Sequence, residues 1–93
     1  MKIIGVIMTY NCEQFVQNAI DQIPKNEFDE LICTDDGSTD NTIEVIKKNN
    51  IQYIVNNHLG YGKNLYAGMK KAFELGATHV IELHGDSQYD FSQ

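Results

Sequence analysis

The chain has 93 residues, a formal net charge of −6, 42% hydrophobic residues and 22% charged residues. These values are typical of one small globular domain, and an acidic surface that repels phosphate backbones argues against nucleic-acid binding. The longest apolar runs are far shorter than the ~20 residues of a transmembrane helix. Residues 1–8 lack the length and cleavage site of a signal peptide and predict a buried strand.

The first half of the chain predicts a strand, a helix and a second strand. Residues 2–8 are apolar and β-branched, as in a strand buried on both faces. Apolar residues recur at helical spacing over residues 12–23, where Asn11 can cap the helix start and Pro24 prevents continuation. Residues 30–34 form the next short apolar run and predict the second strand.

The second half repeats this alternation. We expect a helix, a strand, a longer helix and a final strand over residues 40–49, 51–55, 63–75 and 78–83. Asp40 can cap the first of these helices, and Gly76 has the position of a glycine that follows a helix end.

Such an alternation predicts an α/β fold, a Rossmann-like three-layer sandwich with a mainly parallel sheet and right-handed crossovers. Ligands bind such sheets outside the carboxyl ends of the strands. Every polar cluster of the chain follows a predicted strand, at residues 9–11, 35–40, 56–63 and 84–90. The sequence therefore predicts one binding site on one rim of the sheet.

The cysteines Cys12 and Cys33 have neither the spacing of a metal site nor that of a disulfide framework. They predict free, buried thiols, which suits a cytosolic protein because disulfides are rare in that compartment. We therefore expect a cytoplasmic location.

The acidic pair Asp35 and Asp36 directly follows a buried strand. Adjacent carboxylates repel one another, and the N–H of a base or the hydroxyls of a ribose could offset that repulsion by donating to them. Turn and cap chemistry accounts for Gly37, Ser38 and Asp40 without a ligand, but explains the pair less well.

The segment after the last strand carries His84, Asp86 and Gln88. An imidazole, a carboxylate and an amide oxygen suit Mn²⁺ or Mg²⁺ that is held partly by the phosphates of a ligand. A polar turn with a satisfied histidine is an equally good interpretation of this segment alone.

Two further segments give weaker signals. Lys63 opens a helix, where free amides and a positive charge favour phosphate. Tyr10 could stack on a base, although helix entry accounts equally well for Thr9, Tyr10 and Asn11. His58 and His79 are most simply surface or packing residues.

Taken in order, these segments resemble the nucleotide-sugar-binding N-terminal part of family 2 glycosyltransferases of the GT-A fold, in the style of dolichol-phosphate mannose synthase and other polyprenyl-phosphate sugar transferases. The Asp-Asp-Gly-Ser-x-Asp run at residues 35–40 is the most specific element. The segments at residues 6–13, 60–68 and 85–86 support it through their order and spacing.

The resemblance implies that a sugar passes from a nucleoside diphosphate, UDP or GDP, to an acceptor, with inversion at the anomeric carbon. Thr9, Tyr10, Asn11 and Asp36 would hold base and ribose, with Asp35 beside them. Lys63 would contact phosphate.

The metal motif of the family, Asp-x-Asp, falls on residues 84–86. Asp86 matches the second acid and would contact both donor and metal, Mn²⁺ or Mg²⁺. Gln88 would be a further ligand. His84 replaces the first acid and brings no negative charge.

We read residues 1–93 as a truncated domain, because such catalytic domains need on the order of 200 residues. The acceptor half and its general base would lie outside this chain. The acceptor would be a polyprenyl phosphate or a glycan, reached at the cytoplasmic face of a membrane. The 93-residue chain would then bind nucleotide weakly without turnover.

Two alternatives remain open. A non-catalytic nucleotide-binding or association module could dimerise through an exposed sheet edge. A phospho-acceptor receiver domain also combines acidic residues, a threonine and a lysine at strand ends, but its acidic pair should follow the first strand.

Overall fold

A computed structural model describes residues 1–86, so Gln88 lies outside the described residues. Its elements follow one another as β1 (Ile3–Thr9), α1 (Val16–Gln22), a 3-10 turn η1 (Lys25–Glu27), β2 (Glu30–Asp35), α2 (Thr42–Lys48), β3 (Gln52–Val55), α3 (Tyr61–Glu74) and β4 (His79–His84). The predicted alternation of strands and helices is therefore confirmed. No helix within residues 1–86 is long and apolar enough to cross a membrane.

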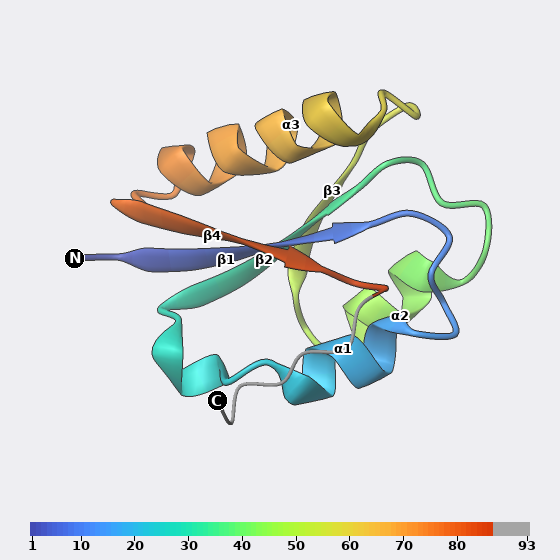
Figure 1. The fold of residues 1–93 in the computed structure, drawn as a ribbon, viewed down its shortest axis with the longest axis horizontal. Helices are drawn as coiled ribbons and strands as arrows, with labels where there is room; N and C mark the ends of the chain where they lie inside the picture. The colour runs from blue at the N-terminus through green and yellow to red at the C-terminus, as the bar shows by residue number, and fades with distance from the viewer. Residues whose placement is uncertain (87–93) are drawn as a thin grey trace.

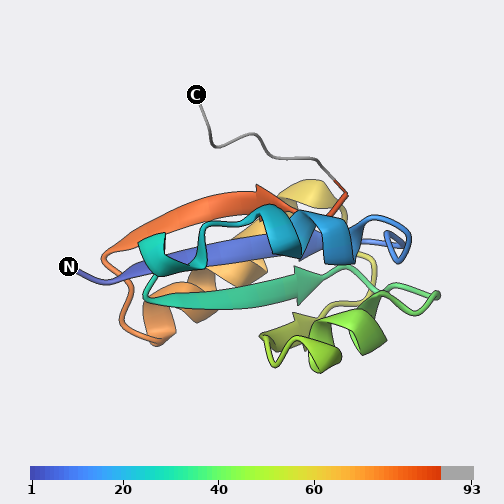
Figure 2. The same ribbon diagram turned by 90° about the horizontal axis from the view of Figure 1, so that it is seen from below.

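The strands form one parallel sheet in the order β3-β2-β1-β4. Helices α1 and α2 cover one face of the sheet and α3 covers the other, so the molecule has three layers (Figures 1 and 2). The chain crosses from one edge of the sheet to the other through α3, which places a switch in strand order between β1 and β4. The predicted fold class is confirmed.

Two apolar clusters hold the layers together, one on each face of the sheet. On the α1 and α2 side, Ile7 of β1 packs with Ile20 and Ile46. On the α3 side, Val6 packs with Ala72 of the helix. Neighbouring residues of β1 thus face opposite layers, as the side-chain alternation of a strand requires.

The strand register brings the carboxyl ends of three strands together. Met8 of β1 pairs with Thr34 of β2 on one side and with His84 of β4 on the other. The loops that leave β1, β2 and β4 therefore start from the same level of the sheet, as the sequence predicts.

The predicted start of the first helix is wrong. Asn11 has a positive φ of 47° and does not cap α1, which begins only at Val16. Its side-chain oxygen instead accepts a hydrogen bond from the Thr39 amide at 2.7 Å. This bond ties the first loop to the loop after β2, a partner 28 residues away that local helix signals do not reveal.

Asp40 and Gly76 lie close to their predicted places at helix ends, although the N-cap residue of α2 is Asn41. The Asp40 carboxylate accepts a hydrogen bond at 3.0 Å from the amide of Thr42, the first residue of α2. Burial alone would raise the Asp40 pKa, but this bond and those from the Thr42 hydroxyl and the Glu13 amide lower it. Gly76 follows the end of α3 with a φ of 94°.

Candidate functional site

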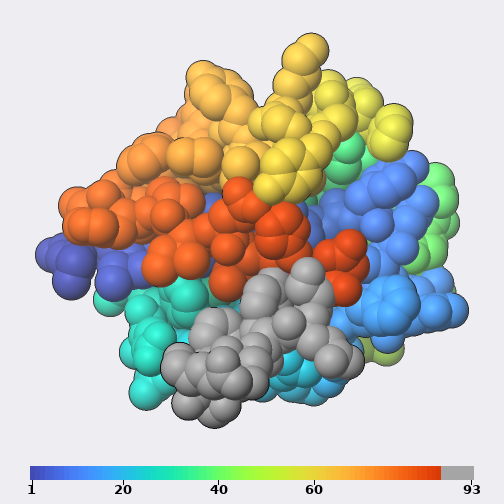
Figure 3. All heavy atoms as spheres, viewed as in Figure 1, coloured from blue at the N-terminus to red at the C-terminus, as the bar shows by residue number. Residues whose placement is uncertain are grey.

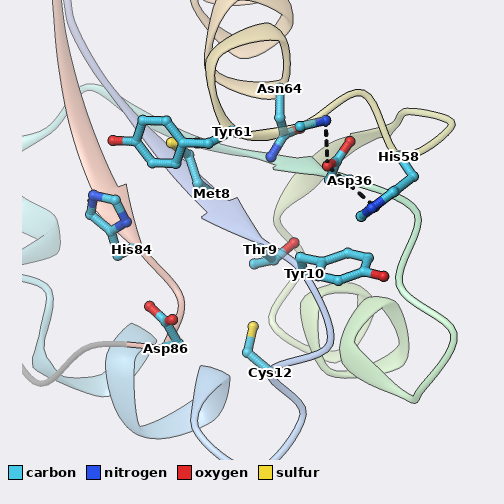
Figure 4. Close-up of a pocket in the computed structure, with 11 residues that line it drawn as sticks. Met8, Thr9, Tyr10, Cys12, Asp36, His58, Tyr61, Asn64, His84 and Asp86 are labelled. Carbon is cyan, nitrogen blue, oxygen red and sulfur yellow. Dashed lines mark hydrogen bonds and ion pairs between the residues drawn. The ribbon is translucent and has the colours of Figure 1, made fainter.

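A pocket of about 310 Å³ opens at the carboxyl ends of the strands, where β1, β4 and the start of α3 meet. In Figure 4, Tyr10 and His58 lie at one end of it, and His84 and Asp86 lie at the other. The pocket occupies the switch in strand order, which is where open parallel sheets bind ligands.

Asp35 is buried and supports the loop that follows β2. One carboxylate oxygen accepts from the hydroxyls of Thr9 and Ser38, both at 2.6 Å. The other accepts from the amides of Gly37 at 3.1 Å and Ser38 at 2.8 Å. Four donors from the protein therefore satisfy this carboxylate.

Asp36 faces the opposite way and organises the loop before α3. Its oxygens accept from the amides of Leu59 at 2.6 Å and Gly60 at 3.0 Å. His58 Nδ1 lies 3.6 Å from the same carboxylate. Asp36 lines the pocket but is only 5% exposed, so the two backbone donors fix its carboxylate at the wall of the pocket with little of it accessible.

The sequence-based interpretation missed Asn64, a buried residue of α3 that also lines the pocket. Its side-chain oxygen accepts from the Thr34 hydroxyl at 2.9 Å and from the Asn56 amide at 2.8 Å. Its own amide donates to the Thr34 carbonyl at 3.2 Å. Asn64 thus fixes the start of α3 against the ends of β2 and β3. The sequence signal that could have revealed Asn64 was a side-chain amide on the inward side of a predicted helix.

Glu82 is a second residue that the sequence interpretation did not single out. It receives a short hydrogen bond from the Tyr61 hydroxyl, and its Oε2 lies 2.6 Å from His84 Nε2. The hydrogen bonds from Tyr61 and then His84 lower the pKa of Glu82, while the bond to Glu82 raises the pKa of Tyr61. The sequence signal for Glu82 was a carboxylate between two apolar residues of β4, Ile81 and Leu83.

The pocket gathers five of the predicted site residues, namely Thr9, Tyr10, Asp36, His84 and Asp86. Asn11, Asp35 and Lys63 are not among its lining residues, so their contact with a nucleotide stays a prediction. Tyr10 lies beside His58, with ring centroids 4.7 Å apart. Tyr10 is 46% exposed and the His58 side chain is 66% exposed, so both rings can be reached by a planar base.

Two side chains that line this pocket, the Asp86 carboxylate and the His84 imidazole, are of types that can ligate a metal. Within residues 1–86, no group of three His, Cys, Asp or Glu side chains could hold a metal ion. A divalent cation at Asp86 would therefore need further ligands, for which the phosphates of a nucleotide are suited.

Cys12 and Cys33 are free and buried, as predicted. Burial raises the pKa of Cys12 to about 11 and that of Cys33 to about 12. The thiolate is the reactive form, so we expect Ellman's reagent at mildly alkaline pH to label the folded chain at least ~100-fold more slowly than the urea-unfolded chain. Equal labelling rates in the two states would contradict the burial of both thiols.

The fold and the pocket together define an α/β domain with a candidate ligand site at the switch in strand order. The family model "Glycosyl transferase family 2" matches residues 6–92, and the chain belongs to this family. The crystal structure of S. aureus TarS 1-349 is similar, with a TM-score of 0.69, 28% identity, and coverage of 95% of this chain and 28% of that chain. TarS 1-349 in complex with UDP gives a TM-score of 0.65 at 25% identity, covering 92% of this chain and 28% of that one.

Two curated relatives match shorter stretches. An uncharacterised glycosyltransferase of Mycoplasma genitalium is 48% identical over 52 residues, 52% of this chain and 18% of the relative. A UDP-N-acetylglucosamine–dolichyl-phosphate N-acetylglucosaminyltransferase of Methanococcus voltae is 35% identical over 43 residues, 46% of this chain and 17% of the relative. The matches thus span less than a fifth of the length of these relatives.

Proposed function

We propose that this chain forms the donor-binding part of a glycosyltransferase that moves a sugar from a nucleoside-diphosphate sugar to an acceptor. The observation that carries the proposal is the pocket at the switch in strand order, which brings Asp36, Tyr10 and Asp86 to one place in a family 2 domain. The acidic pair lies at the end of β2 and not of β1, unlike the pair expected of a receiver domain.

Each side of the pocket has a distinct part in this proposal. Tyr10 offers a ring face to the base, and Asp36 accepts from its N–H groups or from the ribose hydroxyls. Asp86 lies at the opposite end, where the diphosphate would reach it. UDP is the favoured nucleotide, because one similar structure is a UDP complex and one relative is named for a UDP-linked sugar.

A divalent cation, Mn²⁺ or Mg²⁺, would be held by Asp86 together with the diphosphate, with His84 and Gln88 as further candidates. When bound, it would act as a Lewis acid that neutralises charge on the departing diphosphate. Glu82 would keep His84 oriented toward that end of the pocket through their 2.6 Å contact.

The acceptor, the stereochemistry and the general base are proposals that concern a longer protein. A polyprenyl phosphate is the favoured acceptor class, because one relative is named for dolichyl phosphate; a glycan is the alternative. Inversion would require one base to deprotonate the acceptor as it attacks, and we expect that base outside residues 1–93. An enzyme that uses such an acceptor would act at the cytoplasmic face of a membrane. Dimerisation through an edge of the sheet, β3 or β4, stays a prediction.

Titration calorimetry of the 93-residue chain with UDP and GDP tests the donor site. We expect UDP to bind in the presence of Mn²⁺, EDTA to weaken that binding, and Asp86→Ala to weaken it at least about tenfold because a metal ligand is lost. Asp21→Ala, which removes an exposed carboxylate from α1, is the matched control and should bind as the parent does.

Metal-independent binding that Asp86→Ala leaves unchanged would overturn the metal part of the proposal. Absence of binding to either nucleotide at millimolar concentration would contradict the donor site itself. Sugar transfer by the 93-residue chain alone would contradict the expectation that the base lies elsewhere.

A further inference from the structure

The outer face of α3 carries an unusual combination of side chains. The helix buries Asn64, Gly68 and Ala72 on its inner side. Its opposite side exposes Lys63, Tyr66, Lys70 and Phe73, which follow one another at i, i+3, i+7 and i+10. We call these four residues the α3 outer face; they form one stripe because α-helical residues at this spacing share a side.

Two large aromatic rings of this face remain in contact with solvent. Tyr66 is 69% exposed and Phe73 is 52% exposed. Together with Met69, Lys70 and Glu74 they line a shallow groove of about 460 Å³. Figure 3 shows side chains of α3 projecting from the upper edge of the molecule with a notch between them. This groove is separate from the candidate donor pocket.

The charge of α3 is opposite to that of the chain as a whole. The chain has a net charge of −6, with seven basic residues in all. Three of those seven, Lys63, Lys70 and Lys71, lie in α3, whose single acidic residue is Glu74. Among the described residues, none of these lysines forms an ion pair. A positive stripe on an acidic protein therefore remains available for a negatively charged partner.

We propose that the α3 outer face binds the surface of an anionic lipid bilayer. Lysines beside aromatic rings on one side of a helix suit this surface, because the ammonium groups reach the headgroups while the rings enter the interfacial region. Basic residues close to a membrane surface are attracted to its anionic lipids. A second copy of the chain fits less well, because a symmetric contact would bring the lysines of both copies together.

This orientation would place the donor pocket close to the lipid surface. Tyr61 and Asn64, in the first turn of α3, line that pocket. The helix has 14 residues, so its length is about 21 Å. A bilayer along α3 would thus lie within one helix length of the pocket. The inference does not depend on the proposed function, because lipid binding and nucleotide binding are measured separately.

Co-sedimentation with vesicles tests the proposal. We expect the 93-residue chain to bind phosphatidylcholine vesicles that contain phosphatidylserine, to bind pure phosphatidylcholine vesicles much more weakly, and to dissociate at high salt. The variant Lys63→Gln with Lys70→Gln should bind about 25-fold more weakly, about fivefold for each lysine. Its matched control is Lys47→Gln with Lys48→Gln, which makes the same charge change on α2, across the sheet.

A second pair of variants tests the aromatic part. Phe73→Ser should weaken vesicle binding severalfold, whereas Phe15→Ser should not, although Phe15 has a similar exposure of 54% against 52%. Circular dichroism melts check that all variants remain folded. Lys70→Gln should leave UDP affinity as in the parent, which separates this surface from the donor site.

Failure of the parent chain to bind anionic vesicles would overturn the proposal. Equal losses of vesicle binding in the α2 and α3 lysine variants would also overturn it, because the attraction would then not be specific to the α3 outer face. Dimers in light scattering that disappear with Phe73→Ser, without vesicle binding, would assign the face to a second copy of the chain.

Discussion

Replacing Asp35 with alanine is expected to lower the free energy of unfolding by about 3–5 kcal/mol, enough to leave much of a small domain unfolded. The carboxylate is fully buried and accepts four hydrogen bonds, from Thr9, Gly37 and twice from Ser38. Alanine would leave these donors without their acceptor, and a buried donor that loses its partner costs about 1–3 kcal/mol. Urea denaturation followed by circular dichroism measures the loss.

Two variants make this expectation specific. Asp21→Ala removes a carboxylate from an exposed position of α1 and should change stability by less than about 0.5 kcal/mol. Asp35→Asn keeps the shape but replaces one acceptor oxygen with an amide that faces donors, so it should fall between alanine and the parent. An Asp35→Ala chain as stable as Asp21→Ala would contradict the structural role of the buried carboxylate.

The two members of the acidic pair show how far the sequence predicts the site. The pair could be recognised as unusual because both carboxylates follow a buried strand. Adjacent residues at a strand end face opposite sides, so Asp35 turns to its own loop while Asp36 reaches the amides of Leu59 and Gly60. The partners of Asp36 lie more than 20 residues away, and their identity depends on how the β2 and β3 ends meet.

The parallel fold was easier to predict than the details of its loops. Strand and helix periods are local properties, and the alternation of the two restricts the topology strongly. Asn11 was misread because its local sequence suits a helix cap, whereas its actual partners, Ser38 and Thr39, belong to the loop after the next strand. Asn64 was missed for the same reason: its partners are Thr34 and Asn56.

Replacing Gly68 with valine is expected to destabilise the chain by about 3 kcal/mol through overpacking. Gly68 lies on the inner side of α3, where even a Cβ atom would meet Val6 Cγ1 at 2.6 Å and Thr34 Cγ2 at 2.8 Å. The helix would have to move away from β1 and β2. Because Thr34 also holds Asn64 at the pocket, UDP binding should weaken together with stability. Thermal denaturation and calorimetry measure the two effects.

Gly62 provides the matched control on the same helix. A Cβ added there meets nothing within 4 Å, so Gly62→Ala should stabilise the chain by roughly 0.5–1 kcal/mol, the ordinary gain when alanine replaces glycine in a helix. In a double-mutant cycle, Val6→Ala should relieve part of the cost of Gly68→Ala, because it removes the nearest clashing atom. Strict additivity of these two changes would mean that α3 does not pack on β1 through Gly68. Equal changes in the free energy of unfolding for Gly62→Ala and Gly68→Ala would point the same way. Close packing against the sheet is the physical difference between the two positions.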